Sequence, residues 1–258
     1  MKNLKYKIFN PGGNKTGLVY NDKYSDEEKK KINDIILKKH RDVEQVGFIE
    51  NNSYELNMAG GEFCANATRC AVYEYLQGKD GKIEIQVSGQ KEKIIGEIAN
   101  GKVSVTLKIN QKMEEIYQDN LEYSLVNLDG IDFMIYSSFS GKEKLKLLKE
   151  DEDTAKNCLK EEMKQRNLLQ NAVGIILLEE QEQKVKINPV VWVKTIDTVY
   201  YETACGSGSL ATAIYYYLKE NKRKLQIFQP SGYSIDVELI IENDIIKDAK
   251  ISGIVEKS

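Results

Sequence analysis

Two cysteines in similar short runs are the side chains of this sequence best suited to chemistry. Cys64 opens the run CANATRC and Cys205 opens the run CGSGS, about half a chain length further on. Apolar residues at helical spacing follow each run, which predicts a helix that starts at each cysteine. A helix N-terminus attracts anions and lowers the pKa of a thiol placed there. A thiolate and a thiol acting on opposite faces of one carbon could remove a proton and return another.

A structural role is the alternative interpretation for each cysteine taken alone, because free cysteine is among the most buried residue types. Two sites with matching local patterns favour the functional interpretation. Cys70 falls well inside the first predicted helix, so we expect it in the core. Cys158 lies in a highly charged segment, and we expect no special role for it.

The composition excludes several other functions. The 258 residues carry a net charge of −3, so nothing calls for nucleic acid or an anionic membrane as a partner. No signal peptide or membrane span is apparent, and we expect a cytoplasmic protein with reduced cysteines. The single histidine, His40, argues against Ser-His or Cys-His nucleophilic catalysis. Without a close cysteine pair, we expect no metal site.

The order of elements after the two cysteines indicates a duplication. Each predicted helix is followed by a strand that leads to Ser-Gly, at Ser88 and at Ser231. A hairpin-like pair comes next in both halves, with turns at Asn100-Gly101 and Asn243-Asp244. We therefore expect two lobes. One spans residues 1–114, carries Cys64 and is completed by the last strand at 248–258; the other spans 115–247 and carries Cys205.

Two further segments have clear helical patterns. Residues 25–40 predict an amphipathic helix with Ser25 as its N-cap and with Ile32, Ile35 and Ile36 facing inward. Residues 141–166 predict one or two highly charged surface helices.

The motifs resemble those of the diaminopimelate epimerase-like superfamily of cofactor-independent racemases and isomerases. The resemblance covers PGGN at 11–14, EQVGFIE at 44–50, CANATRC at 64–70, ETACGSG at 202–208 and QPSG at 229–232, in the order of that family. It implies an α+β fold of two pseudo-symmetric domains, each a barrel-like, mostly antiparallel sheet around a central helix, with the site between them. It also implies an isomerase that needs no cofactor; a homodimer would be compatible with it.

The resemblance assigns roles to individual residues. Cys64 and Cys205 would be the acid–base pair. The α-amino and α-carboxylate groups of an amino-acid substrate would be held by side chains and by helix N-terminal backbone: Asn14, Gln45, Ala65, Asn66, Gly206 and Ser207. Glu202 would bind the ammonium group, although its spacing to the cysteine differs by one residue from the epimerase pattern.

Departures from the diaminopimelate epimerase pattern bear on the substrate. Those epimerases have a Glu-Arg pair where this chain has Ile196 and Asp197. The Arg that would grip a distal carboxylate is therefore missing, which argues against diaminopimelate. The motif details look most like histidine racemases of staphylopine-type metallophore biosynthesis. Candidates to pack an imidazole or accept its N–H are Phe63, Trp192, Tyr200, Tyr201, Asp197 and Glu202.

We therefore expect an amino-acid racemase that works without pyridoxal phosphate and interconverts L- and D-histidine. Diaminopimelate epimerase and proline-type racemase are the alternatives within the class. A phenazine-type isomerase would not need the two thiols that this chain retains. A thiol-based redox or metal-binding protein is the non-enzymatic alternative.

Overall fold

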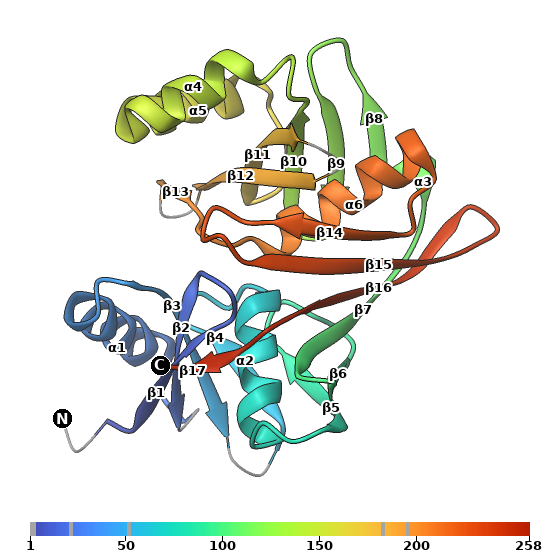
Figure 1. The fold of residues 1–258 in the computed structure, drawn as a ribbon. Coiled ribbons are helices and arrows are strands. Elements are labelled where there is room, and N and C mark those ends of the chain that lie inside the picture. Colours follow the sequence, from blue (N-terminus) through green and yellow to red (C-terminus); the bar gives the residue numbers. More distant parts are fainter. Residues whose placement is uncertain (1–3, 21–22, 51–52, 182–183, 195–196) are drawn as a thin grey trace. The chain divides into compact units, whose positions relative to one another are not determined.

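The computed structural model describes residues 4–20, 23–50, 53–181, 184–194 and 197–258 (Figure 1). The chain forms two compact units, one of residues up to Lys108 together with Lys250–Ser258, and one of Ile109–Ala249. It passes between them within β7 (Lys102–Lys112) and again within β16 (Ile245–Gly253). The division into lobes of 1–114 with 248–258, and of 115–247, stays a prediction about domains.

The first unit wraps strands around one central helix (Figure 1). Most of its strand pairs are antiparallel, and β2–β3 and β4–β5 are parallel. Besides parts of β7 and β16, its elements are β1 (Tyr6–Asn10), β2 (Lys15–Tyr20), α1 (Asp26–Lys39), β3 (Val43–Glu50), β4 (Glu55–Met58), α2 (Ala65–Tyr75), β5 (Gly81–Val87), β6 (Ile94–Ala99) and β17 (Glu256–Lys257).

Helix α1 confirms the prediction for residues 25–40. Ser25 is its N-cap and forms a capping box with Glu28, in which each side chain accepts from the other residue's backbone N–H. Ile32 and Ile36 are buried and pack in one cluster with apolar side chains of β2 and β3. The prediction is wrong for Ile35, which is 39% exposed because it lies beside the apolar stripe rather than in it. The apolar stripe thus fixes α1 on one face of these strands.

Helix α2 lies inside the unit, because its residues from Ala65 to Val72 are all buried. A helix that is buried on every side must be covered by close-packed strands. Strand β6 passes so near that a Cβ at Gly96 would lie 2.2 Å from Cγ2 of Val72. The missing side chain at Gly96 lets the strand approach the helix.

The second unit is built on the same plan around a central helix, α6. Its elements are α3 (Met113–Ile116), β8 (Tyr117–Asp119), β9 (Ser124–Leu128), β10 (Ile131–Tyr136), α4 (Lys142–Glu150), α5 (Glu152–Gln165), β11 (Ala172–Gln181), β12 (Lys184–Val193), β13 (Thr198–Tyr201), α6 (Gly206–Glu220), β14 (Lys224–Phe228) and β15 (Ser234–Glu242). The parallel strand pairs of this unit are β10–β11 and β12–β14. None of the helices in the described parts of the chain is long and apolar enough to cross a membrane.

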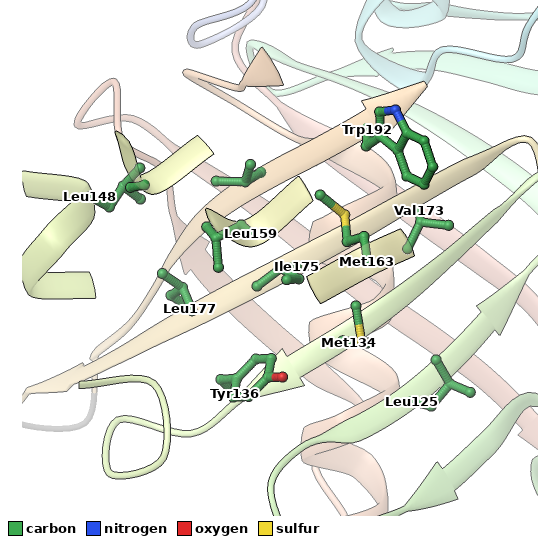
Figure 2. Close-up of a cluster of buried hydrophobic side chains, with 12 residues drawn as sticks. Leu125, Met134, Tyr136, Leu148, Leu159, Met163, Val173, Ile175, Leu177 and Trp192 are labelled. Carbon is green, nitrogen blue, oxygen red and sulfur yellow. The ribbon is translucent and has the colours of Figure 1, made fainter. Parts of the chain in front are cut away.

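Both faces of the sheet in this unit are covered by helices. Helices α4 and α5, which confirm the helical prediction for 141–166, place Leu148, Leu159 and Met163 on one face. Figure 2 shows these side chains against alternate residues of β11, such as Ile175. On the other face, Ile176 approaches the α6 residue Gly208. Alternate residues of β11 thus contribute to two apolar layers, one on each face of the sheet.

The two units repeat one order of elements. In each, a hairpin is followed by a helical crossover to a parallel strand, then by a second hairpin and a second crossover through the central helix. Asn100 and Gly101, and also Asn243 and Asp244, have positive φ values, as a tight primed turn requires. The expected fold class is confirmed: an α+β protein with two pseudo-symmetric, mostly antiparallel parts.

Candidate active site

Cys64 is the N-cap residue of α2. Its backbone is extended (φ −135°, ψ 113°), and its Sγ accepts a 3.4 Å hydrogen bond from the N–H of Ala67. Its carbonyl accepts from the N–H and the hydroxyl of Thr68, at 2.9 and 2.7 Å. These contacts hold the half-exposed sulfur at the start of the helix, as predicted.

A chain of hydrogen bonds leads away from this sulfur. The Cys64 thiol donates to Oε1 of Gln45 at 3.0 Å. Nε2 of Gln45 donates to Oγ1 of Thr16 at 2.9 Å, and this hydroxyl donates to the carbonyl of Asn14 at 3.2 Å. Gln45, predicted to bind substrate, therefore contacts the candidate acid–base thiol directly.

The loop that carries Asn14 is tied to the same helix. Gly12, Gly13 and Asn14 all have positive φ, and Oδ1 of Asn10 accepts from the N–H groups of both glycines. The buried guanidinium of Arg69 donates to the carbonyl of Pro11 at 2.9 Å and to Oδ1 of Asn66 at 2.7 Å. Arg69 thus fixes both the loop and the side chain of Asn66.

Cys205 holds the equivalent position at α6 in the second unit. Its backbone angles (φ −128°, ψ 109°) are close to those of Cys64, and Sγ accepts from the N–H of Gly208 at 3.2 Å. Its carbonyl accepts from the N–H and hydroxyl of Ser209 at 3.0 and 2.7 Å. The sulfur also lies 3.5 Å from the hydroxyl of Ser207.

Gln229 is a residue of this cluster that the sequence motifs did not single out as functional. Its fully buried amide accepts from the N–H of Cys205 at 2.9 Å and donates to Oγ of Ser209 at 3.0 Å. It therefore fixes the backbone on both sides of the helix start. The only signal was its place in the QPSG run, which resembles a family turn.

The predicted lowering of the thiol pKa is wrong at Cys205. Burial raises the pKa of this thiol well above its ordinary value, because the thiolate would lose its hydration. The negative charge of Glu202 and a hydrogen bond with it add to the rise, and the Ser207 hydroxyl and the Gly208 N–H oppose it only in part. Cys70, confirmed as a core residue, has its pKa raised by burial to about 12.

The structure sorts the predicted residues into two groups. In the first unit, Gln45, Ala65 and Asn66 lie at or beside Cys64, and Asn14 is connected to Gln45 through the Thr16 hydroxyl. We call this group the Cys64 cluster. In the second unit, Gly206 and Ser207 open α6 and Glu202 acts on the thiol; with Gln229 they form the Cys205 cluster.

Several of the aromatic and acidic residues that were predicted to contact the substrate side chain have other partners in the structure. Trp192 belongs to the apolar cluster under α5, and its indole N–H donates to Oδ1 of Asp197 at 3.0 Å. The same carboxylate forms an ion pair with Lys160 at 2.8 Å. The hydroxyl of Tyr201 donates to Asn188. Ile196 lies outside the described residues, while Phe63 and Glu202 stay half-buried beside the two cysteines.

Sequence comparisons place the chain among known proteins. The family model described as "Histidine racemase CntK N-terminal domain" matches residues 3–258. A histidine racemase of Fusobacterium nucleatum subsp. nucleatum is 32% identical over 257 residues, covering 93% of this chain and 90% of that protein. A histidine racemase of Staphylococcus aureus is 23% identical, covering 89% and 86%.

Solved structures share the fold at low identity. A hydroxyproline epimerase from Agrobacterium vitis, solved with trans-4-hydroxy-L-proline, has a TM-score of 0.61 and 10% identity, covering 99% of this chain and 90% of that one. A PhzF-family phenazine biosynthesis protein from Enterococcus faecalis has a TM-score of 0.60 and 12% identity, covering 98% and 95%. At this level of identity, the likeness is one of fold.

Proposed function

The chain belongs to the histidine racemase family and is an isomerase of the amino-acid racemase class, and from that premise we propose that it interconverts L- and D-histidine through Cys64 and Cys205. The observation that carries this proposal is the matched geometry of the two thiols. Both are N-cap residues with nearly the same backbone angles, and both sulfurs accept an N–H from the residue three positions on.

The helix starts suit a substrate carboxylate. Backbone N–H groups and the positive end of the helix dipole attract an anion at such a position. We assign the carboxylate to the backbone at Ala65 and Asn66, and at Gly206 and Ser207. Ala65 and Gly206 have small side chains, which would let a carboxylate approach the backbone closely. Asn14, Gln45 and Glu202 are assigned to the polar groups of the substrate, with Glu202 as the anionic partner of a cationic group.

The proton balance needs one thiolate and one thiol. The thiolate takes the α-proton from one face of the α-carbon, and the electron pair stays on the carbon and its carboxylate. The thiol then gives its proton to the opposite face, which inverts the centre and exchanges the roles of the two sulfurs.

Histidine as the substrate is supported by the names of the relatives and by the two residues next to the cysteines. Phe63 precedes Cys64 and Glu202 lies close to Cys205; both are half-buried and could meet an imidazole ring or its N–H. Asp197 is a weaker candidate, because Trp192 and Lys160 already hold its carboxylate.

Hydrogen exchange at the α-carbon tests the proposal. The reduced protein is incubated in D2O with one L-amino acid at a time and no added pyridoxal phosphate. We expect loss of optical rotation and deuterium at the α-carbon of histidine. Exchange with diaminopimelate or proline instead would overturn the substrate assignment. Exchange with none of them would leave a thiol redox or metal-binding role as the better explanation.

Single cysteine variants test the assignment of the acid–base pair. Cys64→Ser and Cys205→Ser should each lower the racemisation rate by about a thousandfold or more, because a hydroxyl is a far weaker acid and its anion is scarcely formed at neutral pH. Cys158→Ser, at an exposed position of α5, is the matched control and should keep full activity. A fully active Cys205→Ser enzyme would contradict the mechanism.

A further inference from the structure

The direction of the hydrogen bonds around Gln45 is fixed by one buried hydroxyl. Thr16 is fully buried, and its single hydroxyl proton goes to the carbonyl of Asn14, which can only accept. Its oxygen must therefore accept from the Gln45 amide, so that Nε2 faces Thr16. The other end of the amide, Oε1, then faces the sulfur of Cys64 at 3.0 Å.

We propose that Thr16 is a positioning residue that locks the Gln45 amide with its oxygen toward Cys64 and thereby holds this cysteine as a thiol in the free enzyme. An acceptor at this distance needs a hydrogen on the sulfur and disfavours the thiolate. The inference rests on the proposed function in one respect, which is that Cys64 is one of the two acid–base groups.

The Cys205 cluster is built differently. Its amide residue, Gln229, binds the backbone N–H of Cys205 rather than the sulfur. The sulfur instead meets the Ser207 hydroxyl, which can donate or accept, and a hydrogen bond links the thiol to Glu202. The two thiols therefore sit in matched backbone settings but face different polar groups. Cys64 faces an amide oriented by Thr16, whereas Cys205 faces a carboxylate and a hydroxyl.

The other ionisable groups around Cys64 do not take over the role of the Gln45 amide in setting the protonation of this thiol. Arg69 and Cys70 follow on α2 itself, and Thr16 also reaches Cys70. Glu44 precedes Gln45 on β3, where the pairing with β2 shifts register, and its side chain is half-buried. The remaining ionisable groups on the strands against α2 are exposed or have partners in ion pairs and hydrogen bonds: Lys15 with Asp42, Tyr20 with Glu74, Glu50 with Ser53, Glu97 with Lys250, and exposed Lys82 and Glu84.

The pH dependence of alkylation tests the proposal without using racemase activity. The reduced protein reacts with iodoacetamide at a series of pH values, and modification of Cys64 is followed by mass spectrometry of its peptide. Thr16→Val keeps the shape but removes the hydroxyl, so the amide can turn and donate to the sulfur. We expect the midpoint for Cys64 to fall by about one pH unit, the size expected when one hydrogen bond changes from acceptor to donor. Thr16→Ser, which keeps the hydroxyl, should match the parent protein.

Two substitutions at Gln45 extend the test if Thr16→Val folds poorly. Gln45→Met removes the acceptor and should also lower the midpoint, whereas Gln45→Glu places a carboxylate there and should raise it. An unchanged or raised midpoint in Thr16→Val or Gln45→Met, or an equal fall in Thr16→Ser, would overturn the proposal. Because the readout is thiol reactivity, a failure of histidine racemisation would not produce or hide the shift.

Discussion

At the scale of single residues, Gly208 shows how closely the backbone surrounds the Cys205 sulfur. A Cβ at this position would lie 3.0 Å from Sγ and 3.3 Å from Cβ of Cys205. Gly208 also supplies the N–H that the sulfur accepts. The equivalent residue after Cys64 is Ala67, whose N–H lies further from its sulfur, at 3.4 Å.

Gly208→Ala should separate stability from activity. The added methyl must push the sulfur away, so we expect the racemisation rate to fall at least about tenfold, which is about 1.4 kcal/mol in the barrier. Thermal unfolding should change little, because alanine gains about 1 kcal/mol of helix propensity over glycine. Ala67→Gly is the reciprocal control: it should lower stability and leave the rate per folded molecule near that of the parent. Equal rates for Gly208→Ala and the parent would contradict the crowding argument.

The buried thiols predict a fall in stability at alkaline pH. Cys70 has a folded-state pKa of about 12, raised by burial, whereas an unfolded cysteine titrates near about 8.5. Between these values the unfolded chain loses a proton that the folded protein keeps, so stability is full below pH 8.5 and is lost as pH rises. Each such thiol contributes a slope of about 1.4 kcal/mol per pH unit in this window. Urea unfolding between pH 9 and 10 should show a slope smaller by this amount in Cys70→Ala, and an unchanged slope would contradict the shift.

The sequence indicated which thiols matter, but not their surroundings. A helix start at Cys205 could be read from the pattern, whereas its raised pKa depends on burial and on Glu202, which only tertiary packing determines. The roles of Gln229 and Thr16 were not visible for the same reason. Each contacts its cysteine cluster from a separate strand or turn, and no local spacing records that contact.

At the scale of elements, the sequence predicted the helices whose positions depend on capping residues and helical spacing. Helix α1 begins after Ser25 with a reciprocal capping box, and α4 and α5 occupy the charged segment at 141–166. The parallel pairs β2–β3 and β12–β14 could not be predicted in this way, because residues far apart in sequence make them. Alternation identifies a strand but not its neighbour.

Ser25→Ala tests the cap of α1. Loss of the hydroxyl removes the acceptor for the Glu28 N–H, and we expect the free energy of unfolding to fall by about 1 kcal/mol. Urea denaturation followed by circular dichroism measures it. Lys30→Ala, an exposed change in the middle of the same helix, should be nearly neutral. If both variants lose the same stability, the capping box is not the cause.

At the scale of the whole molecule, the first unit is closed by the far end of the chain. Strand β17 pairs with β1, Val255 is buried, and the carbonyl of Ile254 accepts from the Arg69 guanidinium at 3.3 Å. Arg69 in turn holds Asn66 and the loop at Pro11. The terminal residues therefore support the Cys64 cluster without touching the sulfur.

Removal of residues 254–258 should therefore damage more than the terminus. Lost burial of Val255 and lost hydrogen bonds predict a fall of about 3 kcal/mol or more in the free energy of unfolding. Urea unfolding measures this, and racemisation should fall with it because Asn66 loses its support. Glu256→Ala, an exposed change in β17, is the control and should be close to neutral. A truncated protein of full stability and activity would show that this segment is dispensable.

The interleaved chain path also has a consequence for biosynthesis. The second unit is one continuous stretch, Ile109–Ala249, whereas the first needs Lys250–Ser258, which the ribosome adds only afterwards. The half that is translated first must therefore be completed last. Until residues 250–258 have emerged from the ribosome, the first unit remains incomplete and Arg69 lacks the Ile254 carbonyl as an acceptor.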